Sequence, residues 1–217
     1  MDRRKAIKSI LTLGAVTLLP LPDVFSQELN LFHYSKKGIG KNLHIIGLGG
    51  GGSSVLTYYH KQGLQAEYTC ISDEQLNSNS KIKFVHYNRP KLDYSENDWT
   101  NYQISIPAEV KSVFETNEQF VILVGLGGNL GTLLAKSLFH YLKNRNKDFI
   151  FICTFPFRCE GIKRKVHAET AFVELKGYHQ IKSFRLDVII DEYGNLYLSE
   201  AFQKAAEYSY NVYMNTL

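Results

Sequence analysis

The stretch HIIGLGGGGSSVL, residues 44–56, places four consecutive glycines between a short apolar run and a segment with helical character. Each glycine costs roughly 0.5–1 kcal/mol more than alanine to order inside a regular element. A run of four is therefore expected where a ligand or another segment must approach the backbone closely. The simpler alternative is a tight turn that needs only small residues.

The rest of the chain alternates short apolar runs with amphipathic stretches. Strands are predicted at residues 43–49, 66–73, 81–87, 119–128, 148–155 and 184–190, and helices at 53–63, 106–117, 131–147, 164–177 and 199–217. Continuous apolar runs such as QFVILVGLGG (119–128) are typical of parallel strands that are covered on both faces. The alternation predicts an α/β fold with a doubly wound, mainly parallel, Rossmann-like sheet.

Two glycine-rich turns follow strands of this sheet, where open parallel sheets bind their ligands. In the first, Gly47, Gly49 and Gly52 have the G-x-G-x-x-G spacing. Asp73, after the second strand, matches the position of a ribose-binding acid, so this turn alone predicts NAD binding. The second turn, GLGGNLGT (125–132), again lies between an apolar strand and a helix. Two such turns predict a phosphate chain held from two sides by backbone N–H groups.

Several segments, in this order, resemble the nucleotide-binding half of the FtsZ/tubulin GTPase family in its bacterial FtsZ branch. They are IIGLGGGGSSVL (45–56), ISDEQ (71–75), GLGGNLGT (125–132) and FPFRCEGIKR (155–164), and SEAFQKAAE (199–207) resembles the start of the family's central helix. The resemblance covers residues 42–217. It implies a tubulin/FtsZ-type nucleotide-binding domain that ends at the central helix.

The resemblance also implies a GTP or GDP site, with Mg²⁺ entering only as a complex of the nucleotide. Residues of the first turn would wrap the α- and β-phosphates (Gly49, Gly50, Gly51, Gly52 and Ser53), and those of the second would hold them from the other side (Gly127, Gly128, Asn129, Gly131 and Thr132). Glu160 would accept hydrogen bonds from ribose hydroxyls, with Arg164 as a nearby cation. Glu200 would accept from guanine N1–H and N2–H. Both glutamates could equally be ordinary solvated acids, and Glu200 suits the first turn of a helix without any ligand.

Departures from the family pattern bear on activity. Three residues of the family's signature loop are replaced, by Asn129, Leu130 and Leu133. Ser54 replaces an asparagine that helps to read the base. Asp191 or Glu192 replaces another asparagine of the nucleotide site. The sequence ends at Leu217, within or just after the central helix, so the catalytic loop that follows this helix in FtsZ falls outside it. We expect at most weak GTPase activity that needs a partner's catalytic loop, and we assign no catalytic residue.

The composition of the chain limits the kinds of ligand and partner that it is expected to bind. The net charge is +4, and no basic block with interleaved aromatic residues is present, which does not favour nucleic acid. The three cysteines, Cys70, Cys153 and Cys159, form no CxxC pair, and the seven histidines form no HxH or HxxxH pair. Neither a disulfide framework nor a protein metal site is expected.

The first 26 residues differ from the rest. Arg3 and Arg4 precede an apolar stretch at 10–21 that is too short to span a bilayer. This order resembles a twin-arginine export signal that ends near Ser26 and predicts a periplasmic protein. The alternative is a cytoplasmic protein with a membrane-associating arm at residues 1–26. Residues 27–41 are predicted to be a linker, and 42–217 the nucleotide-binding domain.

Three functions from different classes remain open. The first is an FtsZ-like guanine-nucleotide-binding module, whose partners would be FtsZ-like subunits or a second copy. The second is a degenerate pseudo-GTPase that serves as an interaction or exported scaffold protein. The third is an NAD-dependent Rossmann enzyme. The two glycine-rich turns and Glu160 favour the first, whereas the export signal favours the second, because an exported protein would not meet a maintained GTP pool.

Overall fold

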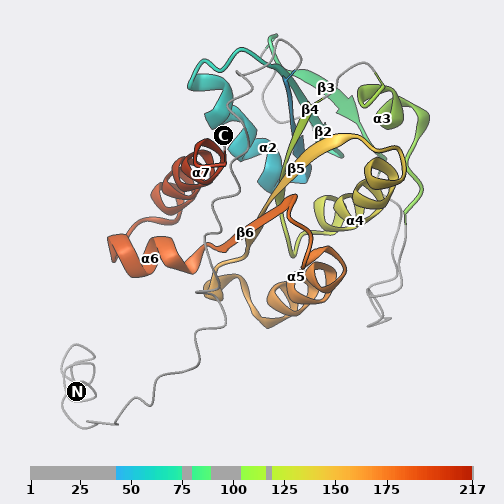
Figure 1. The fold of residues 1–217 in the computed structure, drawn as a ribbon. Coiled ribbons are helices and arrows are strands. Elements are labelled where there is room, and N and C mark those ends of the chain that lie inside the picture. Colours follow the sequence, from blue (N-terminus) through green and yellow to red (C-terminus); the bar gives the residue numbers. More distant parts are fainter. Residues whose placement is uncertain (1–42, 75–79, 89–103, 116–118, 217) are drawn as a thin grey trace, which may run out of the picture. The chain divides into compact units, whose positions relative to one another are not determined.

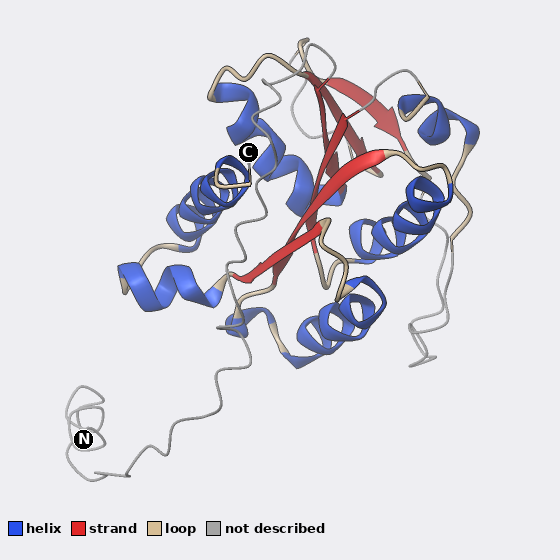
Figure 2. Ribbon diagram, viewed as in Figure 1, coloured by secondary structure: helices blue, strands red, loops and turns tan. Residues whose placement is uncertain are grey.

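The computed structural model describes residues 43–74, 80–88, 104–115 and 119–216, which form a six-stranded sheet with helices on both faces (Figures 1 and 2). The strands are β1 (Leu43–Leu48), β2 (Glu67–Ser72), β3 (Lys83–His86), β4 (Gln119–Gly125), β5 (Asp148–Phe155) and β6 (Ile181–Arg185). The helices are α2 (Gly49–Lys61), α3 (Ala108–Val113), α4 (Asn129–Asn144), α5 (Ile162–Leu175), α6 (Asp187–Tyr193) and α7 (Leu198–Met214), with a 3-10 turn η2 (Arg158–Glu160).

The sheet has the order β3-β2-β1-β4-β5-β6, and every neighbouring pair is parallel. This arrangement confirms the predicted doubly wound α/β fold. The chain builds outward from β1 to β3 and then returns to place β4 on the other side of β1. The carboxyl ends of β1 and β4 therefore flank the switch point at which such sheets bind ligands.

Two hydrophobic layers hold the helices to the sheet. Helices α2 and α7 cover one face, and α3, α4 and α5 cover the other (Figure 1). Phe120 and Phe151 of the sheet and Phe139 of α4 are fully buried between the sheet and the second group. On the first face, the buried Tyr59 hydroxyl donates to the backbone oxygen of Ser209 at 2.8 Å and thereby ties α2 to α7.

Several predicted element boundaries are wrong, two of them near the pocket. The four glycines are not a loop, because α2 begins at Gly49 and contains them in its first turn. The strand predicted at 184–190 ends at Arg185, and Asp187 begins α6 instead. An acid is favourable in the first turn of a helix, and the three-residue spacing of Leu186 and Ile189 lets both side chains enter one small core cluster. The predicted N-terminal segment (1–26) and linker (27–41) lie outside the described residues.

A helix that crosses a membrane must be both long and continuously apolar. Among the residues that the structure describes, no helix combines the two properties.

A buried histidine in β1 makes stability depend on pH. His44 is 3% exposed, and its Nε2 lies 2.7 Å from Thr69 Oγ1. Burial lowers the pKa of His44 to about 4, although Glu67 opposes the shift; Lys83 adds to the lowering. In the unfolded chain the group titrates near 6.5, so the unfolded state binds more protons between about pH 6.5 and 4. We expect the free energy of unfolding to fall across this window by up to about 3 kcal/mol as the pH is lowered.

Urea denaturation at a series of pH values measures this dependence. The His44→Gln variant removes the titrating ring and is expected to flatten the profile between pH 6.5 and 4. An H44Q profile as steep as that of the parent chain would assign the dependence to other groups.

Candidate functional site

A pocket of about 560 Å³ lies where β1, β2, β4 and β5 end and where α2 and α4 begin. It brings together many of the residues predicted from the sequence: Gly49, Gly50, Gly51, Ser54, Asp73, Gly128, Asn129, Gly131, Glu160 and Arg164. These residues come from each of the four segments that resemble FtsZ between residues 45 and 164. The sheet therefore assembles one site from motifs that are far apart in the sequence.

Close backbone packing explains most of the first glycine run. A Cβ atom on Gly52 would lie 2.1 Å from the backbone oxygen of Leu123 in β4, and one on Gly51 would lie 3.2 Å from Gly125 Cα. Gly49 has a φ of +63°, which disfavours other residues. Gly50 differs, because a Cβ there would meet nothing within 4 Å, and the residue lines the pocket.

The same packing brings the N-termini of α2 and α4 together. A Cβ on Gly49 would lie 3.0 Å from Gly131 N, and one on Gly131 would lie 2.9 Å from Leu48 O. The N-cap residues are Leu48 and Gly128, neither of which has a side chain that can accept a hydrogen bond. Neither helix has an acidic residue in its first turn. First-turn N–H groups and the positive ends of two helix dipoles are thus directed to one pocket.

The second glycine turn is held in shape by close packing and by hydrogen bonds. Gly127 has a φ of +88°, and a Cβ on it would lie 2.6 Å from Arg164 O. Its N–H donates to the buried Thr132 Oγ1 at 2.9 Å, and Leu126 N–H donates to Thr154 O at 2.8 Å. Gly127 and Thr132 therefore shape the turn and do not line the pocket.

A carboxylate and a guanidinium occupy another edge of the pocket. Glu160 Oε1 accepts a hydrogen bond from Phe157 N–H at 2.8 Å, and its Oε2 accepts one from Arg164. Of the lining residues within the described part of the chain, Arg164 is the one lysine or arginine, whereas Asp73, Glu74 and Glu160 are acidic. No group of three potential metal ligands among histidine, cysteine, aspartate and glutamate is found within the described ranges.

Other predicted site residues lie outside the lining: Gly52, Ser53, Gly127, Thr132 and Glu200. The buried Ser53 hydroxyl donates to Gly49 O at 2.7 Å and lies 2.9 Å from Cys70 Sγ. Glu200 accepts a hydrogen bond from Tyr197 N–H at 2.9 Å and so caps α7. This placement is the one expected under the alternative in which Glu200 occupies the first turn of a helix without a ligand.

An apolar wall on α7 was missed in the sequence. Phe202 and Ala205 line the pocket, and Phe202 is 44% exposed. The Phe202 ring packs edge-to-face on the buried Phe157 ring, with 5.3 Å between centroids. The three-residue spacing of Phe202 and Ala205 places them on one helical face, which is a signal that the sequence does contain.

Comparisons with known proteins show which proteins this chain resembles in sequence and in fold. No protein-family model matches the chain. The chain is 26% identical over 168 residues to cell division protein FtsZ 1 of Archaeoglobus fulgidus. This alignment covers 71% of this chain and 43% of that protein. Its structure resembles an empty FtsZ dimer of M. jannaschii with a TM-score of 0.62 and 20% identity, covering 78% of this chain and 52% of that one.

The chain is similar to FtsZ in sequence and has the fold of an FtsZ nucleotide-binding domain. A GDP-bound CetZ1 monomer of Haloferax volcanii is also similar, with a TM-score of 0.57 and 17% identity, covering 78% of this chain and 58% of the CetZ1 chain. The FtsZ-like domain thus spans about half the length of the proteins that it matches.

Proposed function

We propose that the FtsZ-like domain binds a guanine nucleotide, GDP or GTP. The observation that carries this proposal is the meeting of two glycine-rich helix N-termini, α2 and α4, at one pocket. Their N-cap residues leave first-turn N–H groups for a ligand, and helix dipoles favour an anion there. The phosphates would therefore lie against Gly50 and Gly128.

The other walls suit a nucleoside. Glu160 can accept hydrogen bonds from ribose hydroxyls with the lone pairs that Phe157 N–H and Arg164 do not use. Phe202 and Ala205 offer an apolar wall against which a base can pack. A volume of about 560 Å³ falls within the range of roughly 300–1,000 Å³ usual for small-molecule sites.

The choice of guanine rests on the similarity to GDP-bound CetZ1. The acidic residues Asp73 and Glu74 in the lining would repel phosphate oxygens, so we expect Mg²⁺ bound to the nucleotide to strengthen binding. Because Glu200 caps α7 instead of lining the pocket, we do not assign it the recognition of the base.

Calorimetric titration of the full chain with GDP, GTP, ATP and NAD, with and without Mg²⁺, tests the proposal. We expect GDP and GTP to bind more tightly than ATP or NAD. Equal affinities for GDP and ATP would reject guanine specificity, and tighter binding of NAD would favour a Rossmann enzyme. Failure of all four to bind would favour the pseudo-GTPase alternative.

We also propose that the nucleotide-bearing face meets a second copy or an FtsZ-like subunit. Exposed apolar side chains lie in or near the pocket segments: Phe202 of the lining is 44% exposed, Ile162 between Glu160 and Arg164 is 80% exposed, and Leu198 in the first turn of α7 is 56% exposed. The similar M. jannaschii FtsZ is a dimer in its structure. Sedimentation velocity with and without GTP, with GTP turnover assayed in the same samples, measures assembly. A monomer at all concentrations, alone and with added FtsZ, would contradict this interface.

A further inference from the structure

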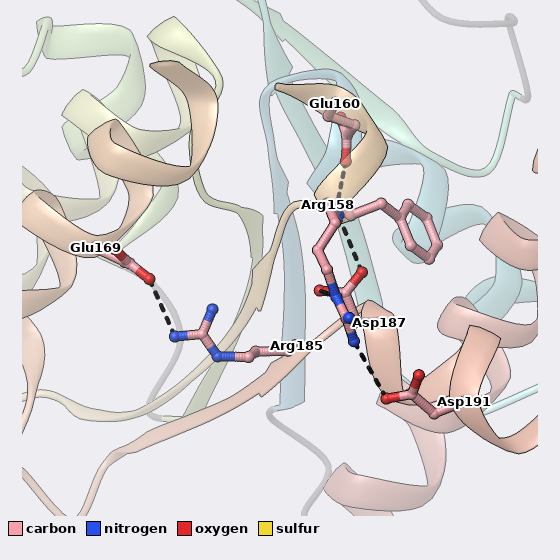
Figure 3. Close-up of polar contacts among 7 residues, drawn as sticks. Arg158, Glu160, Glu169, Arg185, Asp187 and Asp191 are labelled. Carbon is pink, nitrogen blue, oxygen red and sulfur yellow. Dashed lines mark hydrogen bonds and ion pairs between the residues drawn. The ribbon is translucent and has the colours of Figure 1, made fainter. Parts of the chain in front are cut away.

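Two carboxylates from different elements hold the short turn η2 (Figure 3). Phe157 N–H donates to Glu160 Oε1 at 2.8 Å, and the next N–H, that of Arg158, donates to Asp187 Oδ1 at 2.9 Å. Asp187 Oδ2 also lies 3.1 Å from Arg158 Nε, so that one carboxylate binds both the backbone and the side chain of Arg158. Asp191 adds a longer contact of 3.5 Å to the same guanidinium.

Asp187 lies on a firmly packed element. It is the first residue of α6, and its side chain is only 15% exposed. Leu186 and Ile189 beside it are buried in one cluster with Phe157. The carboxylate is therefore a fixed anchor on α6 for the side chain of Arg158, which is 72% exposed.

Glu160 at the far end of η2 is held by contacts within the turn and with α5. Its backbone N–H donates to Phe157 O at 3.0 Å, and its carboxylate binds Phe157 N–H and Arg164. The contact of Asp187 with Arg158 N–H ties the turn that carries Glu160 to α6. Loss of the anchor would let the turn shift and move the carboxylate relative to the pocket.

We infer that Asp187 and Arg158 are positioning residues that set the Glu160 carboxylate at the sugar side of the pocket. This inference rests on the proposed nucleotide-binding function. A hydrogen-bond acceptor fixed before binding loses less conformational freedom on meeting its donor, which strengthens the contact. Recognition of the ribose hydroxyls thereby depends on α6, although neither Asp187 nor Arg158 lines the pocket.

The chain supplies a matched control. Arg185 and Glu169 also form an ion pair, with 3.1 Å between Arg185 Nη2 and Glu169 Oε1 (Figure 3). This pair joins β6 to α5 and is not bonded to η2. The Glu169→Ala variant therefore removes one acidic partner of an arginine, as Asp187→Ala does, without releasing Arg158.

The test measures the Kd of GDP and of 2′,3′-dideoxy-GDP by calorimetry in the parent chain and in D187A, D187N, R158A and E169A. We expect D187A to raise the Kd of GDP about three- to tenfold, the equivalent of one hydrogen bond, and to leave that of dideoxy-GDP unchanged. D187N should lose less, because its amide oxygen can still accept from Arg158 N–H. E169A should bind both ligands as the parent does.

Unchanged GDP binding by folded D187A and R158A would overturn the inference, and so would an equal loss for both ligands. If D187A does not fold, D187N and the exposed R158A carry the same comparison. Adding D187A to E160Q should weaken GDP binding no further than E160Q alone, and additive losses would contradict an action through Glu160. A parent chain that binds no GDP would reject the proposed function itself.

Discussion

Gly52→Ala is expected to unfold the chain or to lower its free energy of unfolding by about 3 kcal/mol or more. The added methyl group would lie 2.1 Å from Leu123 O and 3.3 Å from Gly47 C, and all of these neighbours are backbone atoms of central strands. No side-chain rotation can relieve such a contact, so α2 must move away from the sheet. That movement would open the main packing interface of α2 with β1 and β4.

Urea denaturation followed by circular dichroism measures this effect, with Gly50→Ala as the matched control in the same helical turn. A Cβ on Gly50 meets nothing within 4 Å, and alanine is favoured over glycine in a helix by about 0.5–1 kcal/mol. We therefore expect G50A to be as stable as the parent chain or more stable. Equal stability of G52A and G50A would show that the backbone at Leu123 can shift to accommodate the added methyl group.

Gly50→Leu and Gly128→Leu are expected to weaken nucleotide binding by at least about 1–3 kcal/mol, or about five- to 150-fold, at little expense in stability. A Cβ on Gly50 would have open space around it, and one on Gly128 would come no closer than 3.9 Å to Arg164 Nη2 or Gly125 O. Both residues line the pocket. A large side chain at either position would therefore fill the space proposed for the phosphates and would not disturb the fold.

Titration with GDP measures the loss, and thermal denaturation shows that each variant remains folded. Thr57→Leu adds the same side chain to an exposed position of α2 outside the pocket lining and is expected to bind as the parent does. If folded G50L and G128L variants bound GDP with the parent affinity, the phosphates would not lie at the two helix N-termini.

The sequence by itself determined the sheet and the place of the site. Buried parallel strands are nearly continuous apolar runs, so β4 and β5 can be recognised from local composition. Glycines are tolerated in such numbers only where backbones must approach closely, and this requirement marks both turns in the sequence itself. The alternation of strands and helices then indicates a parallel α/β sheet, in which both turns follow the carboxyl ends of strands and so lie at the same edge.

The tertiary structure decided which residues face the pocket. Gly50 and Gly52 are the same residue type in one helical turn, yet one faces the pocket and the other packs on Leu123 O. Glu200 and Phe202 lie two residues apart, and the acid caps α7 while the aromatic ring lines the pocket. Side-chain direction depends on the rotation of each helix against the sheet, and that rotation is set by the packing of many distant residues, which a local pattern does not contain.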